Sequence, residues 1–294
     1  MRVNDLYTSV TATIIKQLEE GVPPWSRSWK DGKLKGLGFI PTNLVTGRLY
    51  SGSNVLLLWL VAQERGYGNL QFCTFQQADS IGAKVKKGEK SASVLFTKHL
   101  VEKGEDGQDK PRTIIKAYSV FNVDQLENVP DTYLFNQELP NSEAVMYGQA
   151  AELISRNRIT VRNGGNKAAY YPRQDEVHMP FANQFVSEDA YWQTFLHEVT
   201  HWSGNEKRLN RTFGKRFGDN AYTQEELCAE LGSAFLCARL GIPAGFRSAS
   251  YIDSWLKVMR ADNRAVFTAA SYAGQAADYL WNKAFPEVQR QAAE

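Results

Sequence analysis

The sequence of 294 residues lacks a long apolar run and holds only three cysteines. Its best candidate for a membrane helix, NVLLLWLVA, is far shorter than the roughly 20 residues that a membrane span needs. The first residues, MRVNDLYTSVTATIIKQLEE, show no secretory signal pattern. The cysteines form no CxxC motif and no even disulfide framework. These absences argue against a membrane protein and a disulfide-rich secreted domain, and a reducing cytoplasm is the simplest setting.

The composition that is present is that of a folded protein, with 43% hydrophobic and 22% charged residues. The length is enough for one large domain or two ordinary ones. The net charge of +2 conceals an asymmetry. Residues 1–100 hold 13 Lys and Arg against 7 Asp and Glu, whereas residues 136–294 hold 17 against 18. The basic first part is therefore the expected contact for a polyanion.

Helix and strand patterns divide the chain into two α+β domains. Prolines and turn residues interrupt the patterns near the middle, so we expect domains at 1–135 and 144–294 joined by a linker at 136–143. The second domain should hold a small antiparallel sheet over 159–180. The remaining expected elements are a β-hairpin of segments 91–102 and 111–123 and helices over 4–20, 54–65, 142–157, 188–202, 224–240 and from 251 onward.

The stretch FLHEVTHWSG places His197, Glu198 and His201 in the spacing HExxH within the expected helix 188–202. Residues four apart share one helix face, so the two imidazoles can bind one tetrahedral zinc ion. Glu198 is then within reach of a water molecule on the metal and can take its proton. The pattern also occurs in unrelated helices, so an ordinary helix with two histidines is the alternative.

A third ligand is expected from the segment YTQEELCAELGSAFL, where Glu226 and Glu230 lie four apart on one helix face. One of them can bind the metal while the other holds a ligand histidine by its second ring nitrogen. Thr223 and Glu226 also fit a capping box, which would occupy that carboxylate. The residues alone leave Glu225, Glu226 and Glu230 open as the ligand.

Other residues near these motifs are weaker candidates. His178 could line the cleft, although a lone histidine is more often a surface or hydrogen-bonded residue. Tyr222 and the pair Tyr170–Tyr171 could stabilise an oxyanion, with partly buried aromatics as the commoner explanation. The segment DEVHMP has the length of a sheet edge along which an extended substrate could pair, which requires it to lie at that edge.

The basic first part of the chain interleaves aromatic rings with cations. Rings can stack on bases while cations follow the phosphates, so this mixture suits single-stranded DNA bound without sequence preference. The alternative is that the tryptophans anchor a core and the lysines lie in a solvated turn. The residues expected to contact nucleic acid are Trp25, Arg27, Trp29, Lys30, Arg48, Tyr50, Lys84, Lys86, Lys87 and Lys90.

The combination of motifs resembles the ArdC-type antirestriction proteins of conjugative plasmids over nearly the whole chain. PWSRSW, PTNLVTGRLYSGSN and FCTFQQA are similar to the single-stranded-DNA-binding domain of that family, which also occurs in plasmid primase-like proteins. YYPRQDEVHMP, HEVTHWSG, RLNR and YTQEELCAELGSAFL resemble its zincin-like metallopeptidase domain. That domain is akin to the Spartan-type proteases, which act on DNA-bound proteins.

The resemblance implies His197 and His201 as metal ligands and Glu198 as the general base. The E-x-x-A-E segment is similar to the E-x-x-S/A-D/N pattern of thermolysin-like zincins. That similarity implies Glu226 as the third ligand and Glu230 as the support of a ligand histidine. A glutamate at position 230 departs from the usual Asp or Asn. The implied metal is zinc, with another divalent metal such as Mn2+ as the alternative.

The family would imply protection of incoming DNA from restriction in a new host. The leading hypothesis joins non-specific binding of single-stranded DNA to zinc-dependent hydrolysis of an unidentified protein substrate. A second hypothesis is a DNA-binding protector whose zincin domain is proteolytically inactive or only structural. A third is a peptidase whose first domain binds a protein in place of DNA.

Overall fold

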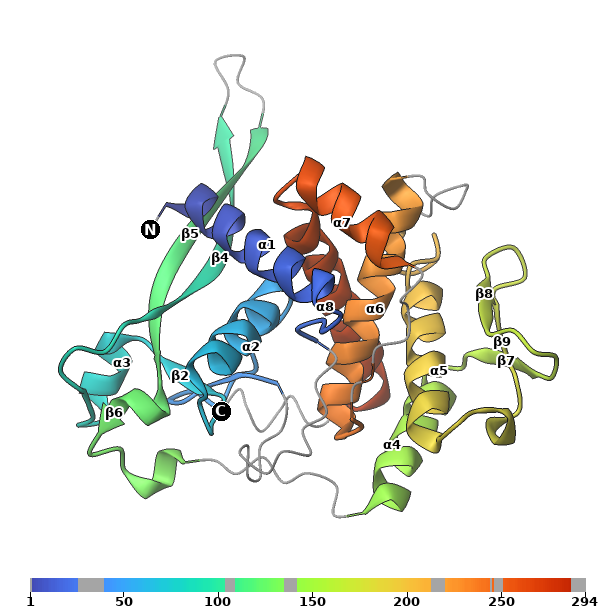
Figure 1. Cartoon of the computed structure of the whole chain (residues 1–294), viewed down its shortest axis with the longest axis horizontal. Coiled ribbons are helices and arrows are strands. Elements are labelled where there is room, and N and C mark those ends of the chain that lie inside the picture. Colours follow the sequence, from blue (N-terminus) through green and yellow to red (C-terminus); the bar gives the residue numbers. More distant parts are fainter. Residues whose placement is uncertain are drawn as a thin grey trace.

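The chain forms an α+β structure with helices and strands in both halves (Figure 1). No helix among the described residues is long and apolar enough to cross a membrane. Most of the predicted linker falls outside the described residues, so its position stays a prediction. The computed structural model describes residues 2–25, 40–103, 109–134, 142–212, 220–243, 245 and 251–286.

Over its described residues, the first half combines helices with a four-stranded sheet in the order β1-β2-β5-β4 and a separate β3-β6 pair. Strands β4 and β5 pair antiparallel from Ala92 opposite Val120 to Lys103 opposite Asp109, which confirms the expected hairpin. The elements are α1 (Val3–Glu19), β1 (Thr42–Asn43), α2 (Ser53–Arg65), β2 (Gln71–Cys73), α3 (Phe75–Ser80), β3 (Lys84–Val85), β4 (Ala92–Lys103), β5 (Asp109–Asn122) and β6 (Leu126–Glu127).

The second half packs a small sheet against one of its helices, and the order of the strands is β7-β9-β8. The expectation of an antiparallel sheet was wrong in one detail, because β7 pairs parallel with β9 and only β8 pairs antiparallel. The C-terminal helical region is two helices. The elements are α4 (Glu143–Arg156), β7 (Thr160–Asn163), β8 (Ala169–Tyr171), β9 (Glu176–Met179), α5 (Glu188–Ser203), α6 (Asn220–Leu240), α7 (Ile252–Ala261) and α8 (Ala265–Ala284).

The two halves share one hydrophobic core. In Figure 1, α8 and α6 occupy the middle of the molecule, between α2 of the first half and α5 of the second. The ring of Trp59 on α2 lies 5.5 Å from that of Phe235 on α6. The backbone of α8 comes so close to the start of α2 that a Cβ on Gly274 would lie 2.5 Å from the amide nitrogen of Gly52. The metal-site helices are therefore packed against the first half.

Candidate metal centre

Helix α5 carries the HExxH motif through the core of the second half. The Oγ of Ser187 caps it by accepting a hydrogen bond from the Ala190 amide at 3.1 Å. Helix α6 packs closely against it, because a Cβ on Gly232 would lie 2.5 Å from the Thr200 side chain. A residue without a side chain at position 232 thus lets the two helices approach.

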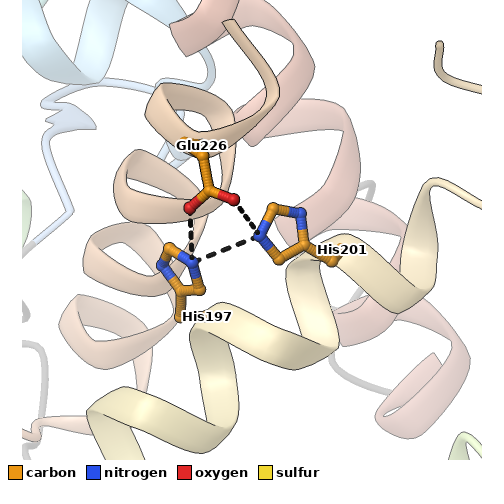
Figure 2. Close-up of side chains that lie close together, drawn as sticks. All are labelled: His197, His201 and Glu226. Atoms are coloured by element: carbon orange, nitrogen blue, oxygen red, sulfur yellow. Dashed lines mark hydrogen bonds and ion pairs between the residues drawn. The ribbon is translucent and has the colours of Figure 1, made fainter. Parts of the chain in front are cut away.

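Three side chains from these helices converge on one point (Figure 2). His197, His201 and Glu226 each offer one atom, and these atoms lie within 4.8 Å of one another. The two Nε2 atoms are 3.2 Å apart. The carboxylate oxygens of Glu226 lie 3.4 Å from Nε2 of His197 and 3.6 Å from Nε2 of His201. Ligand atoms around a tetrahedral zinc ion are about 3.3 Å apart, so the donor set fits such an ion.

Two further carboxylates lie behind the histidines, each on the Nδ1 side of a ring. Glu225 contacts Nδ1 of His201 at 3.0 Å. Glu230, which the sequence predicted as the support of a histidine, lies 3.6 Å from Nδ1 of His197. A carboxylate at Nδ1 favours the tautomer whose Nε2 is free to accept a metal. The imidazole of His201 is therefore held with Nε2 toward the common point, and Glu230 lies on the corresponding side of His197.

Arg211 holds Glu225 in place. Its guanidinium donates to both carboxylate oxygens, at 3.0 and 2.8 Å, and also to the Thr200 carbonyl at 2.6 Å and the Ser203 hydroxyl at 3.0 Å. The orienting roles of Glu225 and Arg211 were not predicted. Arg211 lies in the RLNR segment and Glu225 lies next to Glu226, so both belong to segments noted in the sequence. Only the fold shows that these two residues, 14 positions apart, form an ion pair.

Burial and hydrogen bonding act in opposite directions on the ionisation of the site. Burial disfavours a charged His201, but hydrogen bonds to Glu225 and Glu226 outweigh it and raise the pKa of His201 to about 10. Burial also disfavours the ionised forms of Glu225 and Glu226. Hydrogen bonds to the histidines outweigh burial and lower the pKa of both carboxyl groups, and Arg211 lowers the pKa of Glu225 further. The site thus favours ionised carboxylates, and a proton on His201 competes with a metal ion.

The predicted general base is held by the small sheet. Oε2 of Glu198 accepts a hydrogen bond from the backbone N–H of Tyr170 on β8 at 2.9 Å. The Tyr170 hydroxyl accepts from Asn205 at 2.7 Å and donates to Asp175 at 2.9 Å. Burial is the main reason that the pKa of Tyr170 rises to about 12, so the hydroxyl keeps its proton. Arg208 also pairs with Asp175 and lowers the pKa of that carboxyl.

The other candidate side chains of the second half separate into two groups. The hydroxyl of Tyr222 lies 3.1 Å from that of Tyr251, and burial, Tyr251 and Glu226 all raise the pKa of Tyr222. It thus remains beside Glu226 as a protonated phenol. The ring of Tyr171 instead packs against His178 at 4.3 Å, and alternation along β9 places His178 on the sheet face opposite the buried Val177.

The expected substrate edge was wrong. Strand β9, which contains most of DEVHMP, is the middle strand of its sheet and pairs on both sides. The backbone of β9 is paired with β7 on one side and with β8 on the other, so it cannot also pair with a peptide. The capping-box alternative for Glu226 is also excluded, because Thr223 lies inside α6 and is 2% exposed.

The predicted nucleic-acid residues are partly contradicted. Trp25 is only 3% exposed and its ring lies 6.1 Å from that of Trp255. Tyr50 is 9% exposed, so both rings belong to the core and cannot stack on a base. Arg48 and the four predicted lysines Lys84, Lys86, Lys87 and Lys90 are exposed. Arg27, Trp29 and Lys30 lie outside the described residues.

Comparison with protein families assigns a class to each half of the chain. Residues 148–272 match the family of zincin-like metallopeptidases. Residues 4–121 match the N-terminal domain of the anti-restriction factor ArdC. The chain belongs to the ArdC antirestriction family.

Solved structures match nearly the whole chain. The metal-free crystal structure of the antirestriction ArdC protein from the R388 plasmid has a TM-score of 0.77 and 36% identity, and the match covers 95% of this chain and 98% of that one. The Mn(II)-bound structure of the ArdC protein has a TM-score of 0.76 and 34% identity, covering 96% and 99%. One relative therefore binds a divalent metal.

Relatives of known sequence include proteins of different length. The uncharacterized protein y4eC of Sinorhizobium fredii is 35% identical over 287 residues, which is 94% of this chain and 91% of that protein. The DNA primase TraC of Escherichia coli is 30% identical over 310 residues, and the match covers 98% of this chain but 28% of the primase.

Proposed function

We propose that this protein binds single-stranded DNA without sequence preference, protects incoming DNA from restriction, and hydrolyses peptide bonds at a metal centre. The observation that supports the peptidase activity is the convergence of His197, His201 and Glu226 beside Glu198. The match of residues 4–121 to the ArdC N-terminal domain supports DNA binding and protection, together with the exposed basic side chains of that part.

The three converging side chains would hold a divalent ion, most simply zinc, because two imidazoles and a carboxylate are a common zinc ligand set. Mn2+ is the alternative, since the related ArdC protein has been crystallised with Mn(II). When bound, the ion would supply Lewis-acid activation of a water molecule and of a peptide carbonyl.

Glu198 would act as the general base and then as the general acid. One carboxylate oxygen is fixed by the Tyr170 amide, which leaves the group oriented to take a proton from water and pass it to the leaving amine. The hydroxyl network of Tyr170 ties β8 to the turn after α5, so this orientation does not depend on one hydrogen bond. Tyr222 is placed to donate a hydrogen bond beside Glu226.

The test is the Glu198→Gln variant compared with wild type, both loaded with zinc or manganese. We expect the variant to keep one metal ion per chain and to lose cleavage of fluorescein-labelled casein, measured with and without oligo(dT). Casein cleavage by the metal-loaded variant at the wild-type rate would overturn the role of Glu198. Wild-type protein that holds no metal would overturn the peptidase proposal altogether.

A second candidate function is DNA protection without proteolysis. The observation that favours it is that the ArdC N-terminal match ends at residue 121, well before the metal ligands, so protection can reside in the first half alone. Transfer of an unmodified plasmid into a restricting host that expresses Glu198→Gln distinguishes the two. Full protection by the variant would assign protection to DNA binding, and lost protection would assign it to peptide hydrolysis.

A further inference from the structure

Two exposed aromatic rings lie next to each other on the β4-β5 hairpin. Phe96 of β4 is 55% exposed and Tyr118 of β5 is 46% exposed. Their ring centroids are 5.2 Å apart, with an interplanar angle of 79°. Single exposed apolar residues are common on protein surfaces, but an adjacent aromatic pair indicates a contact surface.

The strand register places both rings on one face of the hairpin. Phe96 lies opposite Lys116, and Tyr118 lies opposite Val94. Opposed residues of antiparallel strands project to the same side, so these four share one face. Val94 is fully buried, so the face changes from core to solvent between Val94 and Phe96. In Figure 1 the hairpin continues beyond α1 as a two-stranded arm.

The charge around the rings favours a polyanion. Lys116 is exposed and stands directly across from Phe96. Segments 92–97 and 114–122, which surround the rings, contain no Asp or Glu. A cation beside open aromatic rings, on strand segments that themselves carry no acid, is the chemistry that binds the phosphate and the base of an unpaired nucleotide.

We propose that Phe96, Tyr118 and Lys116 form a base-stacking platform for single-stranded nucleic acid. The proposal rests on the proposed DNA binding and names its contact surface. Trp25 and Tyr50, the rings first expected to stack, are buried and cannot serve. A stack on an extended strand face also leaves the base edges unread, which agrees with binding that has no sequence preference.

The test is the affinity of the full chain for fluorescein-labelled oligo(dT) at low salt, measured by anisotropy. We expect Phe96→Ala and Tyr118→Ala each to weaken binding by about fivefold or more, and the double variant by more than either. Lys116→Ala should reduce the slope of log affinity against log salt by roughly 0.7, the contribution of one phosphate contact on a single strand.

Two controls separate stacking from general loss of surface area. Ile115→Ala removes a side chain that is 41% exposed on the opposite face of the same strand. Phe75→Ala removes a ring that is 61% exposed on α3. Both variants should bind oligo(dT) as wild type does. Circular dichroism and thermal melting check that all variants fold, and Phe96→Trp adds a fluorescence signal that oligo(dT) should quench.

The possible results distinguish this surface from the wider function. If wild type binds oligo(dT) and the double variant binds equally well, the platform is wrong and DNA binding stands. If wild type does not bind, both proposals fail, and a first half that binds protein is favoured. A double variant that changes only the sedimentation of the chain would assign the rings to self-association and overturn the platform.

Discussion

The metal centre and the hairpin face are built in opposite ways. His197 and Glu226 are 7% and 8% exposed, and each is surrounded by charged or hydrogen-bonding partners. Phe96 and Tyr118 contact each other but remain about half exposed. A metal site needs fixed donor geometry, whereas a stacking surface needs open rings. Substitutions at the metal centre should therefore abolish metal binding, whereas substitutions on the hairpin should weaken DNA binding gradually.

The largest expected effect is the loss of the metal. The double variant His197→Ala/His201→Ala should fall from one bound zinc or manganese ion per chain to none, because only Glu226 of the three converging ligands remains. Elemental analysis after dialysis measures this. Its affinity for oligo(dT) should stay at the wild-type value, and a parallel loss of DNA binding would break the contrast between the two regions.

The next effect concerns the carboxylate behind His201. Glu225→Gln should weaken zinc affinity by about 10- to 100-fold, since loss of a carboxylate that orients a ligand histidine has that cost. Competition with a chelating dye measures it. The matched control is Glu152→Gln, whose carboxylate pairs with Arg156 at a surface where the two side chains are 43% and 50% exposed. Equal affinities of the two variants would contradict an orienting role for Glu225.

A smaller effect tests the packing between the two halves. Gly274→Ala should lower stability by about 1–3 kcal/mol, because its Cβ would lie 2.5 and 2.6 Å from backbone atoms of Gly52. Gly148→Ala is the control, since a Cβ there meets nothing within 4 Å and α4 gains a better helix former. Denaturant unfolding compares them. Equal stability of the two variants would show that α8 and the start of α2 are not closely packed at Gly274.

The smallest effect is the pH dependence of chelator-treated protein. His201 has a raised pKa, so its contribution to stability is complete below about pH 6.5 and is lost as pH rises through about 10. Glu225 has a lowered pKa, so its contribution is complete above about pH 4.3 and is lost on acidification. The melting temperature should therefore fall as the pH rises from 6.5 to 9. His201→Ala should show a flatter profile, and superimposable profiles would refute the assignment.

Local periodicity predicted that the two histidines share one helix face, whereas the choice of Glu226 rested on the resemblance to the family. His197 and His201 lie one turn apart on one helix, and Glu226 lies on the next helix within a recognisable segment. The roles of Glu225 and Arg211 could not be predicted, because they depend on how α5, α6 and the intervening turn pack. The three-residue spacing of Thr223 and Glu226 was misleading, since α6 begins before Thr223.

The exposure of the predicted nucleic-acid residues was harder to predict, because exposure is not encoded in residue type. Trp25 has the composition of a stacking residue, yet α7 supplies Trp255 to cover it. Strand order is equally non-local, which is why β9 was expected at an edge and lies in the middle. The helix expected over 54–65 begins one residue earlier, at Ser53, and Gly52, at φ 57°, is its N-cap.

The close approach of Gly274 to Gly52 has a consequence for how the gene can be divided by recombination. Recombination that separated the two halves would expose the apolar faces of α2 and α8, and neither fragment would inherit a complete core. The two halves are therefore expected to be inherited together as one unit. The match to TraC agrees with this expectation, because both halves align together within one longer protein. The match covers 98% of this chain and 28% of TraC.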